Sequence, residues 1–261
     1  MPAVRPSRVS DPLAPLLDLP GVAEAVVKAR DAVVTLHHHP VNRTGWTASA
    51  AEAALRAARA SAALDGARLV IDRRAGAEDG DGCDDAGDAE VVADPVLAGA
   101  VRAAEATGRL LGVWRTAPLQ ALARLHALAG ADLDGEPGRP VRGSARLALL
   151  ADLATGATTV PAPVLVAVVH GELLAVAPFP SANGVVARAA ARLASIASGL
   201  DPRGLAVPEV GHLRAVAEYR RAAEGFAAGT PEGLGSWIRH CCDQWVAGAR
   251  EGRSIAEARG K

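Results

Sequence analysis

Apolar residues recur at intervals of three and four along most of the chain, a spacing that places them on one face of an α-helix. Segment 131–142 breaks this pattern, because it is polar and contains Gly135, Pro137, Gly138 and Pro140. The periodic segments on either side of it predict an all-α fold. We expect helices over residues 22–36, 49–66, 95–108, 116–129, 144–153, 164–176, 185–197 and 212–227, and a last helix beginning near Thr230.

Capping residues predict where several of these helices begin. Ser49 is followed three residues later by Glu52, which is the arrangement of a capping box. Asp94, Thr116 and Thr230 each stand directly before an expected helix. Their side-chain oxygens can accept hydrogen bonds from the free N–H groups of the first turn. We therefore expect each of the three to be an N-cap.

The turn between the sixth and seventh helices is the most informative stretch of the chain. Pro178 and Pro180 end the first helix, and the next begins at Asn183-Gly184. The unpaired N–H groups of a helix start point toward one spot, which attracts an anion such as phosphate. The residues of this turn therefore predict an anion-binding site.

Composition fits a helical protein and limits the classes of partner. Half of the residues are apolar but only 3% are aromatic, so Ala, Leu and Val must form the core. A formal net charge of −1 gives no general attraction to nucleic acid or to an anionic membrane. No uncharged apolar run of about eighteen residues is present, and the charged, proline-containing start is unlike a secretory signal. We expect a cytoplasmic protein, and the excess of Ala, Arg and Gly over Lys and Asn suggests a bacterial source.

Three groups of residues suggest metal ligands, but a simpler interpretation exists for each. The consecutive histidines at 37–39 fan outward, so we expect them on the surface. The acidic stretch 78–85 lacks the glycine and terminal glutamate spacing of a calcium loop. Residues 240–242, His-Cys-Cys, point about 100° apart on a helix and should pack rather than bind one ion. The sequence therefore predicts no metal site.

The chain from Ala177 to Arg188 resembles the signature of the Fic family, H-P-F-x-[D/E]-G-N-G-R-x-x-R. Five positions match, at Pro178, Phe179, Asn183, Gly184 and Arg188. Members of this family mostly transfer AMP from ATP to a protein hydroxyl. The resemblance implies a Fic-like helical bundle with a short β-hairpin flap.

Two further segments resemble the same family in the expected order. Ser61, Asp65 and Gly66 resemble the [S/T]-x-x-x-E-[G/N] motif of members that carry an inhibitory helix, with Asp in place of Glu. Residues 122–144 resemble the helix and flap region, with His126 on the helix. An Asp near a helix C-terminus is disfavoured by the helix dipole and needs a cationic partner. The resemblance nominates Arg188, which can form a two-point contact with a carboxylate.

The resemblance also divides the chain into functional segments within one compact domain, for which 261 residues are sufficient. The expected segments are an N-terminal helical extension (1–48), an inhibitory-type helix (49–72), an acidic, glycine-rich and mobile loop (73–94), a Fic-like core (95–251) and a tail (252–261).

Several signature residues on which the family's chemistry depends are replaced in this chain. Ala177 stands in place of the histidine base, Ser181 in place of the acidic metal ligand, and Val185 in place of the first arginine. Loss of a positioned base alone costs roughly 100- to 10,000-fold in rate. We therefore expect no catalytic residue and no AMP transfer by the family's mechanism.

What remains of the signature predicts binding. The implied nucleotide-binding residues are Ser181, Asn183, Gly184 and Arg188, which would hold ATP, ADP or phosphate, while Pro178 and Phe179 form the scaffold. A protein partner would fit a regulatory role of this kind.

Two alternatives remain open. The chain could be a transferase that uses His170, or another group, on a different phosphorylated donor. It could instead be a ligand-free interaction module in which Asp65 and Arg188 form a fixed internal contact.

Overall fold

The computed structural model describes residues 11–67, 94–133 and 135–260, and within these residues all regular structure is helical. The prediction of an all-α fold is confirmed. The elements are η1 (Ala14–Asp18), α1 (Val22–His37), α2 (Pro40–Thr44), α3 (Trp46–Leu64), α4 (Pro95–Thr116), α5 (Pro118–Ala129), α6 (Ser144–Asp152), the π-helical turn η2 (Leu153–Ala157), α7 (Ala162–Val176), α8 (Asn183–Ala197), α9 (Pro208–Arg214), α10 (Val216–Ala228) and α11 (Pro231–Arg259).

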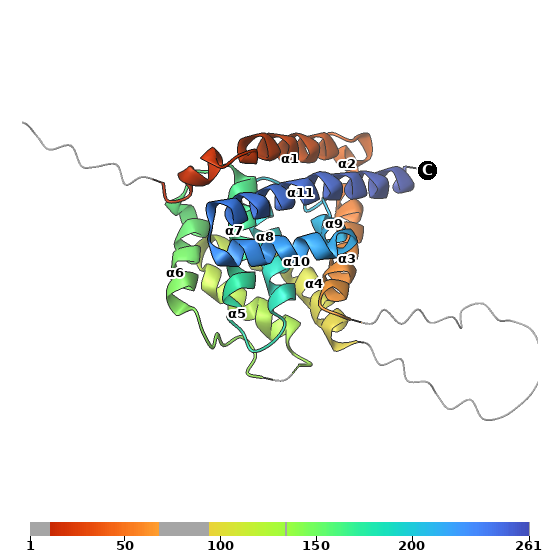
Figure 1. The fold of residues 1–261 in the computed structure, drawn as a ribbon. Helices are drawn as coiled ribbons and strands as arrows, with labels where there is room; N and C mark the ends of the chain where they lie inside the picture. The colour runs from red at the N-terminus through yellow and green to blue at the C-terminus, as the bar shows by residue number, and fades with distance from the viewer. Residues whose placement is uncertain (1–10, 68–93, 134, 261) are drawn as a thin grey trace, which may run out of the picture.

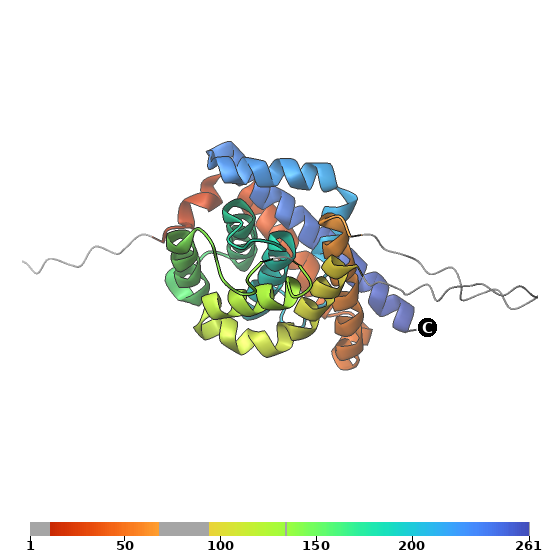
Figure 2. The ribbon, with the colours of Figure 1, turned by 90° about the horizontal axis from the view of Figure 1, so that it is seen from below.

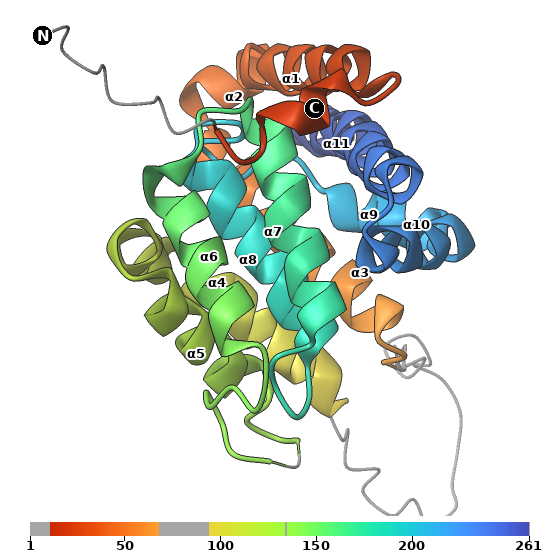
Figure 3. The same cartoon turned by 60° about the vertical axis from the view of Figure 1, so that its left-hand side comes forward.

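Helices α7 and α8 lie side by side in the middle of the bundle (Figures 1 and 3). Helices α4 and α5 pack against each other and both contact α8, while α1 packs along α11. Seen from below, α10 lies at one edge of the bundle and the α4–α5 pair at the other (Figure 2). The C-terminal part of α3 reaches α8, which brings the two predicted motif segments together.

The composition of α7 and α8 explains their central position. Helix α7 is apolar on nearly all sides, and such a helix is stable only when other helices surround it. On α8, Ala187, Ala190 and Ala191 are buried, and these small side chains let neighbouring helices approach closely. Trp114 on α4 and Trp237 on α11 supply the bulk that the alanines lack.

Two of the expected helix starts are wrong. Helix α3 begins at Trp46, so Ser49 lies inside the helix, and Glu52 pairs with Arg56 at 2.7 Å instead of closing a capping box. Thr116 is the last residue of α4, where its hydroxyl donates to the Gly112 carbonyl at 3.2 Å. Helix α3 thus begins before the expected cap, and α4 continues past its expected end at Gly108 until Pro118 begins α5.

The other expected helix boundaries are confirmed only in part. Asp94 accepts hydrogen bonds from the first turn of α4, and Thr230 does so for α11, as predicted. The expected helix over 212–227 is two helices, because the backbone leaves the helical region at Ala215. The C-terminal tail is also not separate, since α11 continues to Arg259 and buries Ile255.

Segment 135–143, where the resemblance implies a hairpin flap, contains no strand. It lies against the α7–α8 turn, and the N–H of Val141 donates to the carbonyl of Pro178 at 2.8 Å. Pro140 has no N–H to contribute to a regular ladder. The acidic loop lies outside the described residues, apart from its last residue, Asp94. Of the helices that the structure describes, none is both long and apolar enough to cross a membrane.

Candidate functional site

The α7–α8 turn has an unusual backbone at both ends. Ala177 at the end of α7 has φ 43°, and Ala182 at the start of α8 has φ 53°. These are the two residues other than glycine with positive φ in the described part of the chain. A side chain in this left-handed region crowds its own backbone, at a cost of about 1–2 kcal/mol. The backbone of these two alanines is therefore unfavourable by itself, and contacts with surrounding residues must stabilise it.

Asn183 provides part of that support. Its side-chain oxygen accepts from the N–H of Phe179 at 2.9 Å, and its side-chain nitrogen donates to the Phe179 carbonyl at 2.8 Å. The ring of Phe179 stacks on His126 of α5, with centroids 4.2 Å apart and planes 6° apart. The side chain of Asn183 is thus used to close the turn, and its backbone begins α8. Pro178 contributes through its carbonyl, which accepts from Val141.

The end of α3 lies over the start of α8, with Arg188 between them. Arg188 is 3% exposed and donates from Nε to the hydroxyl of Ser61 at 2.7 Å. Its Nη2 donates to the carbonyl of Ser61 at 2.9 Å and to Oδ1 of Asp65 at 2.7 Å. Its Nη1 donates to the hydroxyl of Tyr219 at 3.2 Å. The predicted contact between Asp65 and Arg188 is therefore present, and most of the guanidinium donors are engaged.

Gly184 shows how close the Asp65 carboxylate comes to α8. A Cβ atom added at Gly184 would collide with both carboxylate oxygens of Asp65. The carboxylate therefore stands against the first turn of α8, where the helix dipole favours a negative charge. Gly66 follows Asp65 with φ 90°, a conformation that suits glycine as the chain leaves α3. Sequence analysis predicted the ion pair but not this contact with α8.

Charge on Arg188 is maintained despite its burial. Desolvation alone would lower its pKa, but Tyr219 and Asp65 outweigh it and raise the pKa above the usual value. Tyr219 was missed by the sequence analysis, although it is the single tyrosine of the chain. Its own pKa is raised by burial, against the opposing effect of Arg188, so the hydroxyl stays protonated.

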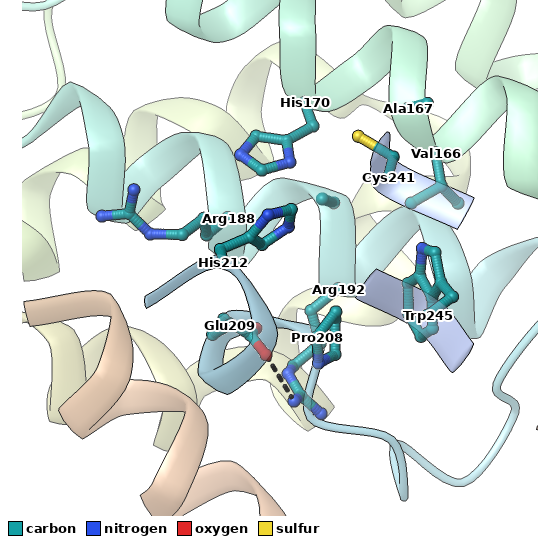
Figure 4. Close-up of a pocket in the computed structure, with 11 residues that line it drawn as sticks. Val166, Ala167, His170, Arg188, Arg192, Pro208, Glu209, His212, Cys241 and Trp245 are labelled. Atoms are coloured by element: carbon teal, nitrogen blue, oxygen red, sulfur yellow. Dashed lines mark hydrogen bonds and ion pairs between the residues drawn. The ribbon is translucent and has the colours of Figure 1, made fainter. Parts of the chain in front are cut away.

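Behind Arg188 lies a buried cluster of histidines. His170 Nε2 is 2.9 Å from the hydroxyl of Tyr219, and His212 Nδ1 is 3.1 Å from His240 Nε2. His170 and His212 face a cavity of about 20 Å³ together with Arg188 (Figure 4). A cavity of that size holds about one water molecule. His170, the alternative reactive group, is therefore packed inside the bundle and engaged with Tyr219.

The other ligand-type residues have structural contacts. His37 pairs with the buried Asp201 at 2.7 Å. Of the three consecutive histidines only His38 is exposed, while His37 and His39 are half-buried, so the expectation that all three lie on the surface is wrong. Cys241 and Cys242 are buried and free, and burial raises the pKa of Cys242 to about 12. Among the described residues, no group of three such side chains is arranged to hold a metal ion.

No protein-family model matches the sequence, and no curated protein matches it. Among solved structures, the crystal structure of a Fic family protein from Desulfovibrio desulfuricans G20 is similar, with a TM-score of 0.65. The match covers 90% of this chain and 74% of that protein, at 19% sequence identity. At this identity the similarity is evidence for the fold alone. The chain has a Fic-like fold, as the signature residues of the α7–α8 turn had suggested.

Proposed function

We propose that this protein binds the phosphate groups of a nucleotide at the start of α8, without transferring AMP, and that the end of α3 blocks the site. The nucleotide would be ATP or ADP, and binding would regulate contact with a protein partner. The observation that carries the proposal is the position of Asp65, whose carboxylate lies against Gly184 at the α8 N-terminus.

A carboxylate in this place behaves as an internal competitor of an anionic ligand. It already lies where the dipole of α8 attracts an anion. It also accepts a hydrogen bond from Arg188, which we assign to the phosphate as well. Ser61 holds two further donors of the same guanidinium. A ligand phosphate would therefore gain Arg188 only as the end of α3 moves away.

The side chains of the turn are suited to binding a nucleotide but not to catalysing AMP transfer. Ala177 has no group that could accept a proton from a target hydroxyl, and Val185 adds no cation. Ser181 is a poor sole ligand for magnesium, which prefers carboxylates and phosphates. Incubation of the purified protein with labelled ATP and magnesium should leave it and added lysate proteins unlabelled. Metal-dependent labelling that is lost on changing a residue of the turn would overturn this part of the proposal.

Isothermal titration with ATP and with ADP, with and without magnesium, tests the binding. We expect weak binding to the natural chain and binding about tenfold tighter or more to Asp65→Ala, because a charge-assisted contact no longer competes. Asp152→Ala is the matched control, since Asp152 is exposed on α6 and has no side-chain partner among the described residues. Absence of heat at about millimolar nucleotide for Asp65→Ala would refute the proposal.

A second candidate function is a ligand-free interaction module, and one observation favours it. Arg188 is 3% exposed and is bonded to two other helices, which is also the arrangement of a fixed structural contact. In that case Asp65→Ala should lower the melting temperature without creating any nucleotide binding. The same titration, run beside a thermal melt, separates the two functions.

A further inference from the structure

Arg188 is held from two directions, and one of them does not involve α3. Three of the hydrogen bonds that its side chain donates end on Ser61 and Asp65, at the end of α3. The fourth runs from Nη1 to the hydroxyl of Tyr219 on α10. The proposed function requires the end of α3 to move away from α8, and that movement removes the first three bonds together. Among the residues that the structure describes, Tyr219 is then the hydrogen-bond partner that remains.

The hydroxyl of Tyr219 is itself fixed by the core. Tyr219 and His170 are both buried, and Nε2 of His170 lies 2.9 Å from the hydroxyl oxygen. A guanidinium can only donate, so this oxygen accepts from Arg188 and keeps its own proton to donate. Burial, followed by the charge of Arg188, lowers the pKa of His170 well below its usual value, so the ring is neutral. We assign Nε2 as the acceptor, because this assignment gives the buried hydroxyl proton a partner.

The link from Arg188 through Tyr219 to His170 connects three helices other than α3. Arg188 is on α8, Tyr219 on α10 and His170 on α7. Helix α7 packs along α8, so that His170 and Arg188 project from neighbouring helices (Figure 4), and α10 packs against α7 and α11. None of these interhelical contacts involves α3. The link can therefore persist when the end of α3 leaves.

The donors that α3 occupies lie along one edge of the guanidinium group. Nε donates to the hydroxyl of Ser61 at 2.7 Å, and Nη2 donates to the Ser61 carbonyl at 2.9 Å and to Oδ1 of Asp65 at 2.7 Å. The guanidinium is planar, and the N–H bonds of Nε and Nη2 on this edge point the same way, so together they can bind two oxygens of one anion. Nη1, the nitrogen bonded to Tyr219, is not part of this edge. Departure of α3 therefore frees a two-donor edge and leaves Nη1 engaged.

We propose that Tyr219 is a positioning residue: it holds Nη1 of Arg188 when the end of α3 leaves, so that the freed Nε and Nη2 donors bind two oxygens of one phosphoryl group. The inference rests on the proposed function and adds to it a residue on α10 and the edge of Arg188 that meets the ligand. A long side chain without such an anchor loses more conformational freedom when it binds, which weakens binding.

Tyr219→Phe is the main test, because it removes the hydroxyl and keeps the ring. Ser195→Ala is the matched control: its buried hydroxyl donates to the carbonyl of Arg192 at 2.8 Å and lies about two turns beyond Arg188 on α8. Arg188→Lys keeps the charge but loses the two-donor edge. All are made in the Asp65→Ala background, with circular dichroism and a thermal melt to establish folding.

ADP binding to each variant is measured by isothermal titration. We expect Tyr219→Phe to weaken it about fivefold to tenfold, Arg188→Lys about tenfold or more, and Ser195→Ala less than about twofold. His170→Leu is a second variant that acts through the tyrosine, because it removes the acceptor of the hydroxyl proton. It should weaken ADP binding about threefold.

The ¹⁵N–H signal of Arg188 Nε gives a second readout, and it is assigned by its loss in Arg188→Lys. This signal should shift when ADP is added to Asp65→Ala, and it should broaden in the ADP complex of Tyr219→Phe. A purely structural role of Tyr219 would lower the melting temperature but leave both the signal and the ADP affinity unchanged.

The outcomes separate this inference from the proposed function. If Asp65→Ala binds ADP and both Tyr219→Phe and His170→Leu bind it equally well, the inference fails while the proposed function stands. Equal binding by Arg188→Lys overturns the two-donor edge, and with it the inference alone. If Asp65→Ala binds no ADP at all, the proposed function and the inference fall together.

Discussion

The buried histidine cluster behind Arg188 should make the fold sensitive to mild acid. His170 and His212 lie inside the bundle, and burial, followed by the neighbouring cationic or titratable groups, lowers the pKa of each well below its usual value. Each therefore remains neutral in the folded protein at pH values where it would be protonated in the unfolded chain. The groups that contact or electrostatically influence His170 are Arg188 on α8, His212 on α9, Tyr219 on α10, and Trp237 and His240 on α11.

The sign of the effect follows from proton binding. Below about pH 6.5 the unfolded chain binds a proton at each of these histidines and the folded chain does not, so protons favour unfolding. Stability is complete above that pH and is lost as the pH falls. Between about pH 7.5 and pH 5.5, one histidine that stays neutral in the fold should cost about 1.4 kcal/mol, and two about 3 kcal/mol.

The free energy of unfolding can be measured by urea titration at several pH values in this window, where carboxyl groups of ordinary pKa contribute little. We expect His170→Gln and His212→Gln each to reduce the acid-induced loss by about 1.4 kcal/mol, whatever they do to stability at pH 7.5. His38→Gln, at an exposed histidine of the same chain, should leave the loss unchanged. A flat profile in the natural chain, or an unchanged slope in both variants, would refute the reasoning.

Three further predictions concern the α7–α8 turn. Ala182→Gly should raise the free energy of unfolding by about 1 kcal/mol by relieving the left-handed backbone, whereas the control Ala189→Gly, inside α8, should lower it by a similar amount; thermal melts decide this. Asn183→Ala should cost about 1–3 kcal/mol, seen in urea titration, because two backbone groups of the turn lose their partners. Gly184→Ala should cost about 1–3 kcal/mol in the natural chain and clearly less in an Asp65→Ala background, so a double-mutant cycle that gives strict additivity would contradict the close approach of that carboxylate.

Much of the fold could be predicted from local pattern, and several of the errors concern where a helix begins. The N-caps at Asp94 and Thr230 hold because a helix-starting proline follows each of them, so the side chain and the backbone give the same signal. Ser49 and Thr116 have capping side chains, but Ser49 lies inside α3 and Thr116 is the last residue of α4. After Thr116 the boundary is set by Pro118, the first residue of α5, and α3 begins at Trp46 directly after Gly45.

The site was predictable only where a resemblance linked distant segments. Asp65 and Arg188 are 123 positions apart, and no periodicity relates them. Tyr219 and His126 were not assigned to the site, since each looks like an ordinary core residue in its own helix. Their roles come from contacts across helices, Tyr219 with Arg188 and His126 with Gly138. Such contacts depend on tertiary packing, which the sequence of one helix does not specify.

The position of Asp65 ties the fold to the proposed regulation. At the end of α3 its charge faces the negative end of its own helix, which is unfavourable, yet the same charge lies at the positive end of α8, which is favourable. The carboxylate is therefore stabilised by α8 and Arg188 rather than by the helix that carries it. An anion that reached α8 would compete for the same field and the same guanidinium, and would leave Asp65 with only its unfavourable helix end. Ligand binding and the docking of α3 should consequently exclude each other, as a regulated site requires.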